Sequence, residues 1–213
     1  MTGVPSGYWN GKFVAVCDPE PPPEDHGDRR PNPERPTPEQ LLEPEEAVER
    51  ARRGLDEYGL YERGDWRGTL EAAEPRDPVL VERLDRTDDY YYIVPMGPNG
   101  EQMSAAVNVD ARFGDYLQAL AFPGPGETFL AALEPENVLE TVLERPLELP
   151  DHEGSLVLRD GLFCVYPILV WKPCRESLSP FYPFRMITRG TRQIFVRSDG
   201  AVFTELHEDA PGI

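Results

Sequence analysis

The tetrapeptide Leu42-Glu43-Pro44-Glu45 returns letter for letter as Leu133-Glu134-Pro135-Glu136. A similar apolar run follows each copy: Val79-Leu80-Val81 in the first half of the chain and Ile168-Leu169-Val170 in the second. The tetrapeptides are 91 residues apart, and the apolar runs are 89 residues apart. Because landmarks that recur at one spacing are typical of a repeated structural unit, the sequence predicts an internal duplication.

Each copy of the tetrapeptide predicts the start of a helix. Proline suits the first helical turn, where its missing N–H costs nothing, and glutamates beside it lie at the positive end of the helix dipole. The first copy is followed by an apolar face with helical spacing, formed by Ala47, Ala51, Gly54, Leu55 and Tyr58. Gly59 is a stop signal for this helix. The second copy is followed by the apolar residues Val138, Leu139, Val142 and Leu143.

Strand signals follow both predicted helices. In the first half they cover residues 79–86, 90–96, 102–110 and 116–122. In the second half the Asp160-Gly161 turn predicts a hairpin of residues 156–159 and 162–165, before strands at 168–172, 181–188, 193–197 and 201–206. We therefore expect an α+β fold of two tandem units, each with a helix packed on an antiparallel β-sheet. The two units are expected to span residues 42–125 and 133–213.

Residues 1–41 precede the two units and contain a short predicted strand followed by a proline-rich, acidic segment. Between Asp18 and Glu46 there are nine prolines and ten acidic residues against three arginines. Such a stretch cannot bury enough apolar surface to fold alone, and its prolines favour an extended polyproline II conformation. The sequence leaves open whether this segment is a solvated linker, a lid on the protein's own body or a contact arm for a partner.

Tyr92-Ile93-Val94 is followed by the strand and turn Val107-Asn108-Val109-Asp110-Ala111-Arg112-Phe113-Gly114, and the second half matches the turn as Val196-Arg197-Ser198-Asp199-Gly200. This pattern of a strand that ends in an Asp-x-x-x-Gly turn resembles the PepSY and cystatin-like class of small α+β domains. The resemblance implies a non-catalytic binding or inhibitory module and brings no active site to transfer. PepSY domains are usually extracytoplasmic, whereas the N-terminal residues lack the basic region that opens a signal peptide.

Composition and charge limit the classes of function. The formal net charge is -18 and the pI is near 4.5, so the protein repels phosphate backbones and nucleic-acid binding is disfavoured. The longest apolar stretch, residues 162–171, is too short to span a bilayer. Secreted disulfide scaffolds usually carry many cysteines in an even number. This chain has only three, which are Cys17, Cys164 and Cys174. We therefore expect a cytoplasmic protein that binds neither membrane nor nucleic acid.

No motif commits the chain to a reaction. Neither a metal nor another cofactor is expected, because metal-site spacing is missing among the three histidines, His26, His152 and His207. Cys164 has only His152 as a nearby base in the sequence, and a free cysteine is more often a packing residue. Carboxylates that could perform acid–base chemistry, if they converge, are Asp85, Asp88 and Asp110. We expect no catalytic residues, and the alternative is a hydrolase-like enzyme that uses Cys164 with His152 or the clustered carboxylates.

One stretch of the chain has the opposite charge balance. Between Val170 and Arg197 there are six basic residues and one acidic residue. Arginine and aromatic side chains contribute much of the binding energy in protein interfaces. We therefore predict a protein-binding module, of the inhibitor or immunity type, whose contact residues are Trp171, Tyr182, Arg185, Arg189 and Arg197. Two alternatives stay open: these arginines pair with the acidic N-terminal segment, or the chain is a structural subunit of a larger bacterial assembly.

Overall fold

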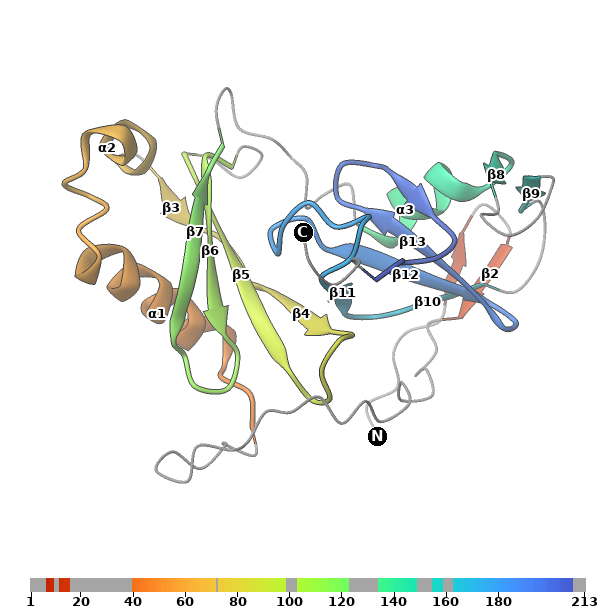
Figure 1. The fold of residues 1–213 in the computed structure, drawn as a ribbon, viewed down its shortest axis with the longest axis horizontal. Coiled ribbons are helices and arrows are strands. Elements are labelled where there is room, and N and C mark those ends of the chain that lie inside the picture. Colours follow the sequence, from red (N-terminus) through yellow and green to blue (C-terminus); the bar gives the residue numbers. More distant parts are fainter. Residues whose placement is uncertain are drawn as a thin grey trace. The chain divides into compact units, whose positions relative to one another are not determined.

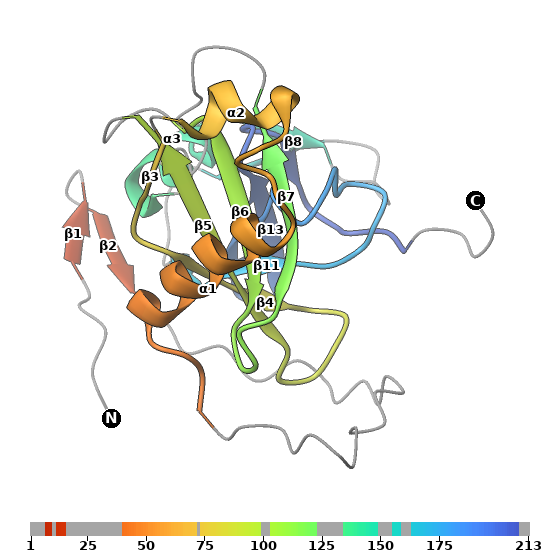
Figure 2. The same cartoon turned by 90° about the vertical axis from the view of Figure 1, so that its left-hand side faces the viewer.

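The computed structural model describes residues 7–9, 12–15, 40–71, 73–98, 103–122, 134–148, 155–158 and 163–208. The chain divides into two compact units, and each is described by itself (Figures 1 and 2). The middle unit is Asp25–Thr128, and the split unit combines Met1–Glu24 with Phe129–Ile213. The proline-rich, acidic segment before Gln40 lies outside the described residues.

The middle unit contains two helices and an antiparallel sheet. The helices are α1 (Pro44–Glu57) and α2 (Gly64–Leu70). The strands are β3 (Glu74–Pro75), β4 (Val79–Arg83), β5 (Tyr90–Gly97), β6 (Ala105–Asp110) and β7 (Tyr116–Ala121). Strands β4 to β7 are neighbours in chain order, and β3 pairs with β5. The sequence thus predicted all four longer strands, with ends within three residues of those observed.

Helix α1 covers one face of this sheet. Its residues Ala47, Ala51 and Leu55 are 0% exposed and pack in one core with apolar side chains of β5 and β6. The helix starts at Pro44 as predicted, and Gly59 just beyond its end has φ 63, a backbone conformation that glycine adopts without strain. Tyr58 differs from the prediction, because its side chain is 65% exposed and stacks on Tyr116.

The Asp-x-x-x-Gly turn between β6 and β7 is held by the side chain of its aspartate. Asp110 Oδ1 accepts hydrogen bonds from the backbone N–H groups of Arg112 and Phe113, at 2.9 and 2.7 Å. Gly114 closes the turn with φ 71, which a residue with a side chain would adopt only with strain. An aspartate that mimics a backbone turn in this way explains why the motif is readable in the sequence.

The split unit contains a mixed sheet, a two-stranded sheet and one helix among its described residues (Figure 1). The helix, α3 (Pro135–Val142), buries Val138, Leu139 and Val142. The strands are β1 (Gly7–Trp9), β2 (Lys12–Ala15), β8 (Pro146–Glu148), β9 (Ser155–Val157), β10 (Phe163–Val165), β11 (Leu169–Trp171), β12 (Phe184–Arg189), β13 (Arg192–Arg197) and β14 (Val202–Phe203). Strand β12 pairs with β10, β11 and β13, and β10 also pairs in parallel with β2.

The expected α+β fold of two helix-plus-sheet units is wrong. The protein is predominantly β, and the described residues contain only three short helices, none of them long and apolar enough to cross a lipid bilayer. Helix α3 has eight residues, and the chain turns at Glu144, with φ 59, directly into β8. The parallel pairing of β2 with β10 makes the sheet mixed, which conflicts with a second antiparallel, PepSY-like α+β repeat.

The predicted hairpin of residues 156–165 does not form either. Strand β9 pairs with β8, where Leu156 is opposite Leu147, and together they make the separate two-stranded sheet. Strand β10 pairs with β12 and β2, where Cys164 is opposite Thr188 and Ala15. A turn signal predicts a hairpin only if the strands on both sides prefer each other, and here each has a different partner. The Asp160-Gly161 turn itself lies outside the described residues.

Candidate functional site

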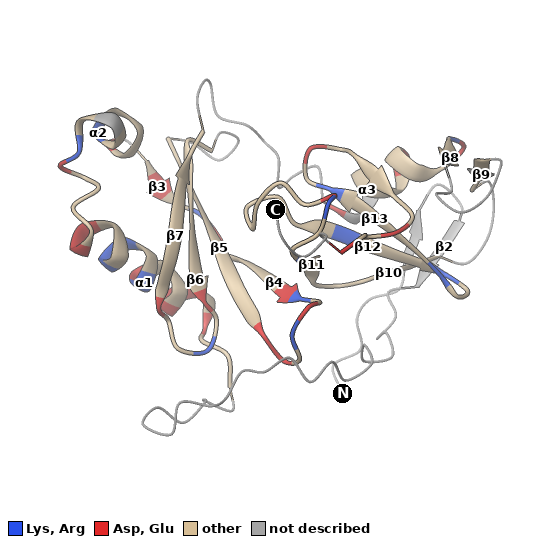
Figure 3. Ribbon diagram, viewed as in Figure 1, with Lys and Arg blue, Asp and Glu red and all other residues tan. Residues whose placement is uncertain are grey.

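Strands β12 and β13 carry the arginine-rich part of the chain (Figure 3). Their register places Arg185 opposite Val196 and Phe184 opposite Arg197. Because side chains alternate between the faces of a strand, Arg185 and Arg189 share one face of this pair, and Arg197 lies on the other. The predicted contact residues therefore do not all belong to one patch.

Arg185 is held by backbone carbonyl groups of the split unit. Its Nη1 donates hydrogen bonds to the carbonyl oxygens of Tyr166 and Pro167, each at 2.8 Å. Burial lowers the pKa of the guanidinium to about 10, while the nearby carboxylate of Glu134 acts in the opposite direction. Arg185 is therefore charged at neutral pH, and it fastens the turn between β10 and β11.

Arg197 is also engaged within the split unit. Its Nε and Nη2 bind the two carboxylate oxygens of Asp199 at 2.9 and 2.7 Å, and Nη1 donates to the carbonyl oxygen of Glu176. The guanidinium carbon lies 5.2 Å from the centre of the Phe203 ring. Hydrogen bonds from Arg197 are the main cause of the lowered pKa of Asp199. These contacts fix the loop after β13 and leave Arg197 little freedom to meet a partner.

The two predicted aromatic contact residues differ in exposure. Trp171, at the end of β11, is only 7% exposed and belongs to the buried residues of the split unit. Tyr182 is half-buried in a turn, where its backbone N–H donates to the carbonyl oxygen of Ser179 at 2.9 Å. Tyr182 can reach a partner at the surface, whereas Trp171 is a packing residue.

The end of the β12–β13 hairpin carries two arginines side by side. Arg189 and Arg192 are directly opposite each other across the Gly190-Thr191 turn. The guanidinium carbon of Arg189 lies 5.7 Å from the centre of the Phe163 ring. Arg192 is exposed and has no ion pair among the described residues. Sequence reasoning did not select Arg192, although the spacing Arg189-Gly190-Thr191-Arg192 was the signal that could have found it.

A polar cluster joins the loop after β11 to the C-terminal part of the split unit. The backbone N–H of His207 donates to Glu176 Oε2 at 2.8 Å, and His207 Nδ1 lies 2.8 Å from Glu176 Oε1. The backbone N–H of Arg175 donates to the carbonyl oxygen of His207 at 3.0 Å. Burial by itself raises the pKa of the Glu176 carboxyl. Hydrogen bonds to the carboxylate, chiefly those from His207, lower the pKa by more, so it lies below its usual value.

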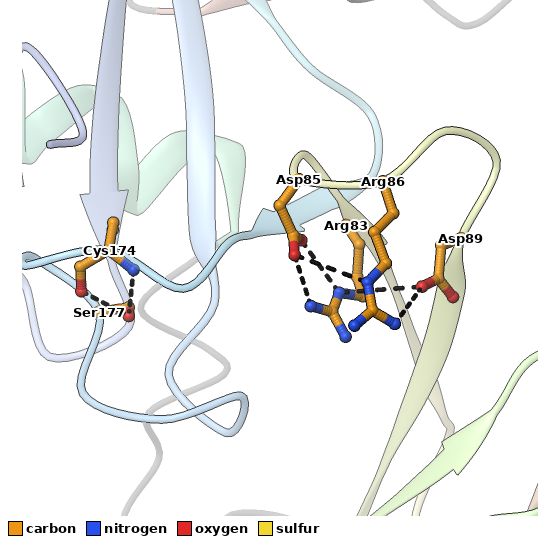
Figure 4. A network of polar contacts seen from close by, with 6 residues as sticks. All are labelled: Arg83, Asp85, Arg86, Asp89, Cys174 and Ser177. Carbon is orange, nitrogen blue, oxygen red and sulfur yellow. Dashed lines mark hydrogen bonds and ion pairs between the residues drawn. The ribbon is translucent and has the colours of Figure 1, made fainter. Parts of the chain in front are cut away.

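Cys174 lies beside this cluster and is only 2% exposed. Figure 4 shows Ser177 bound to its backbone: the Ser177 hydroxyl donates to the carbonyl oxygen at 2.9 Å and accepts from the N–H at 3.1 Å. Burial raises the pKa of the Cys174 thiol, and the charge of Glu176 adds to this effect. A raised thiol pKa is the opposite of what a cysteine nucleophile needs. Cys164 is disulfide-bonded, and His152 lies outside the described residues.

The candidate carboxylates of the middle unit are engaged separately. Asp85 receives two hydrogen bonds from Arg83, at 3.0 and 2.6 Å, Asp88 pairs with Arg112, and Asp110 caps its own turn. Figure 4 shows the ion-pair network formed by Arg83, Asp85, Arg86 and Asp89. Alternating charges of this kind stabilise a loop. The described residues contain no group of three or more side chains able to hold a metal ion.

Comparison with known proteins gives no relative for this chain. No protein-family model matches it. No curated protein and no solved structure matches it either. The contacts and charges of the described residues are therefore the basis for a functional proposal.

Proposed function

We propose that this chain is a non-catalytic protein-binding module, of the inhibitor or immunity type, which contacts an acidic surface through the end of the β12–β13 hairpin. The observation that carries the proposal is the cross-strand pair of Arg189 and Arg192. Two guanidinium groups directly opposite each other on neighbouring strands present several N–H donors side by side. A carboxylate of a partner that lies between them would form short, charge-assisted hydrogen bonds with both.

The surroundings of the pair support this use. Gly190, Thr191, Arg192 and Gln193 are all exposed, so the end of the hairpin can reach another molecule. Phe163 lies under Arg189 and provides an aromatic surface that orients its guanidinium. Arg185 and Arg197 hold the hairpin and the adjoining loops in place from the two faces of the strand pair. In this proposal they position the contact surface and do not form it.

The experiment compares two charge-reversal variants of the tagged full-length protein in extracts of its source organism. Arg189→Glu with Arg192→Glu keeps a like-charged pair at the hairpin but reverses its sign. The matched control is Arg53→Glu with Arg67→Glu, two exposed arginines of α1 and α2. We expect wild-type and control proteins to retain the same partner, identified by mass spectrometry, and the hairpin variant to lose it. Retention of every bound protein by a folded hairpin variant would refute this contact surface.

We propose the cytoplasm as the compartment, on the acidic composition and the low cysteine content. The disulfide at Cys164 argues the other way, because disulfides are more common in oxidising compartments. Fractionation of the source cells, with detection of the protein by antibody, shows whether the protein is in the cytoplasm or in an oxidising compartment.

A further inference from the structure

Strand β7 is the edge of the sheet in the middle unit. It pairs with β6, and no strand among the described residues pairs with its other side. Its sequence, Tyr116-Leu117-Gln118-Ala119-Leu120-Ala121, contains no charged residue and no proline. Natural edge strands are usually protected from pairing with other chains by lysines, prolines or strong bulges. The register of β7 with β6 shifts between Asn108 and Val109, which leaves Leu117 as an extra residue in β7. Beyond this irregularity residues 118–121 are in regular register and carry neither charge nor proline, so this part of the edge is suited to accept a strand.

Exposed apolar side chains gather at the start of this edge. Among the described residues the large hydrophobic side chains with the highest exposure are Tyr58 (65%), Leu178 (61%) and Leu117 (51%). Leu117 belongs to β7, and Tyr58 stacks on Tyr116 of β7 with ring centres 4.8 Å apart. We call Tyr58, Tyr116 and Leu117 the edge patch. It combines aromatic and aliphatic surface with open backbone groups, which is the composition of an interface centre.

The edge patch is fixed before any partner arrives. Helix α1 lies across β5, β6 and β7 (Figure 2), and Gly54 of this helix lies directly against the ring of Tyr116. The ring of Tyr116 is confined on one side by Gly54 and covered by Tyr58. A surface that is already ordered loses little conformational entropy on binding.

Exposed carboxylates are the sequence neighbours of the edge patch. Asp56, Glu57 and Asp115 are exposed and lie within two residues of Tyr58 or Tyr116 in the chain. Residues 40–122 carry 18 aspartates and glutamates against 9 arginines. Of the arginines in and beside the turn of residues 110–114, Arg50 is bound to Glu46 at 2.8 Å and Arg112 is paired with Asp88. The chemistry at this edge therefore favours a positively charged occupant.

We propose that β7 binds an extended, basic segment of another protein as an added β-strand. The backbone of that segment pairs with the open side of β7, and alternate side chains meet the edge patch. A lysine or arginine of the segment lies over the stacked tyrosines, where a cation is attracted to the ring faces. A second copy of this chain is a poorer occupant, because it would bring the same carboxylates against each other. This binding edge is separate from the arginine hairpin of the proposed function.

The test uses the full-length protein and two synthetic eight-residue peptides, one of alternating lysine and valine and the other of alternating glutamate and valine. Leu117→Lys adds a protective charge to the edge, and Tyr58→Ala removes the outer ring. The matched control, Leu178→Lys, makes the same change at an exposed leucine of the split unit. Calorimetry measures the dissociation constants, and circular dichroism checks that each variant is folded.

We expect the lysine peptide to bind the wild-type protein and the Leu178→Lys variant equally, and the glutamate peptide to bind neither. Leu117→Lys and Tyr58→Ala should each weaken binding of the lysine peptide about tenfold or more. The hairpin variant Arg189→Glu with Arg192→Glu should bind the peptide at least as well as wild type. Failure of the lysine peptide to bind, or equal binding to all variants, would overturn the proposal. So would a wild-type dimer in sedimentation experiments that Leu117→Lys converts to a monomer.

Discussion

Gly54 of α1 lies so close to Tyr116 of β7 that a Cβ built on the glycine would come within 2.3 Å of Tyr116 Cδ2. Real Cβ atoms do not approach another heavy atom so closely, so the helix and the edge strand can meet only if position 54 has no side chain. The same ring stacks on Tyr58. The packing of α1 on the sheet and the geometry of the edge patch therefore depend on one glycine.

Gly54→Ala should destabilise the protein, although alanine favours a helix over glycine by about 1 kcal/mol. The added methyl group must displace Tyr116 or shift the helix, and overpacking of this kind costs about 1–3 kcal/mol. Urea unfolding followed by circular dichroism measures the difference. Gly68→Ala in α2 is the control, because a Cβ there meets nothing within 4 Å. Gly68→Ala should be as stable as wild type or slightly more stable. An equal loss of unfolding free energy in the two variants would contradict the close contact of Gly54 with Tyr116.

Arg185→Ala should also destabilise the protein, by about 1–3 kcal/mol, because two backbone carbonyls lose a charged donor. Arg185→Lys should recover only part of this loss, since an ammonium on a flexible chain does not reproduce the planar fork of arginine. Arg192→Ala is the matched control at the exposed end of the same hairpin and should leave the melting temperature unchanged. A melting temperature of Arg185→Ala equal to that of the control would show that Arg185 is free at the surface.

Helix α1 and the four longer strands of the middle unit could be predicted from the sequence because their signals are local, whereas α2 and β3 were not predicted. Pro44 and Gly59 mark the ends of α1, and Asp110 with Gly114 marks a turn whose side-chain hydrogen bonds involve residues two and three positions away. The split unit depends on pairings between distant segments, such as β2 with β10. Such pairings leave no local pattern in the sequence. The Asp160-Gly161 signal favoured a hairpin of β9 with β10, but β9 pairs with β8 and β10 pairs with β12.

The predicted contact residues show the same limit. Alternation along a strand is sufficient to place Arg185 and Arg189 on one face of β12. It could not show that carbonyl oxygens nearly twenty residues earlier in the chain bind Arg185, or that Arg197 belongs to the opposite face. Charge counting found the basic region, but the cross-strand pair of Arg189 and Arg192 follows only from the register.

The cysteines should differ in reactivity. Cys174 is a free thiol that is only 2% exposed, so iodoacetamide should modify it only after unfolding in guanidinium. Cys164 is disulfide-bonded and should react only after reduction. Mass spectrometry of tryptic peptides distinguishes the two sites. Rapid alkylation of Cys174 in the folded protein would contradict its burial and would reopen the question of a nucleophilic role.

Glu176 should make stability depend on acid pH. Its pKa is lowered from 4.5 in the folded protein, so the carboxylate contributes stability that is fully present above pH 4.5 and is lost as the pH falls through the folded value. Glu176→Gln should therefore be less stable at pH 7 by about 1–3 kcal/mol, the usual contribution of hydrogen bonds to a charged group. The difference from wild type should shrink towards pH 3, where the carboxyl of the wild-type protein becomes protonated.

Urea unfolding at intervals between pH 3 and pH 7 measures this dependence. The control is Glu208→Gln, a neighbouring exposed glutamate without an ion pair among the described residues. The other groups that face Glu176 are the ring of His207, Glu205 beyond it and the guanidinium of Arg197, and none of them changes in either variant. Parallel stability curves for wild type and Glu176→Gln would mean that the contact with His207 does not hold the C-terminal part of the split unit in solution.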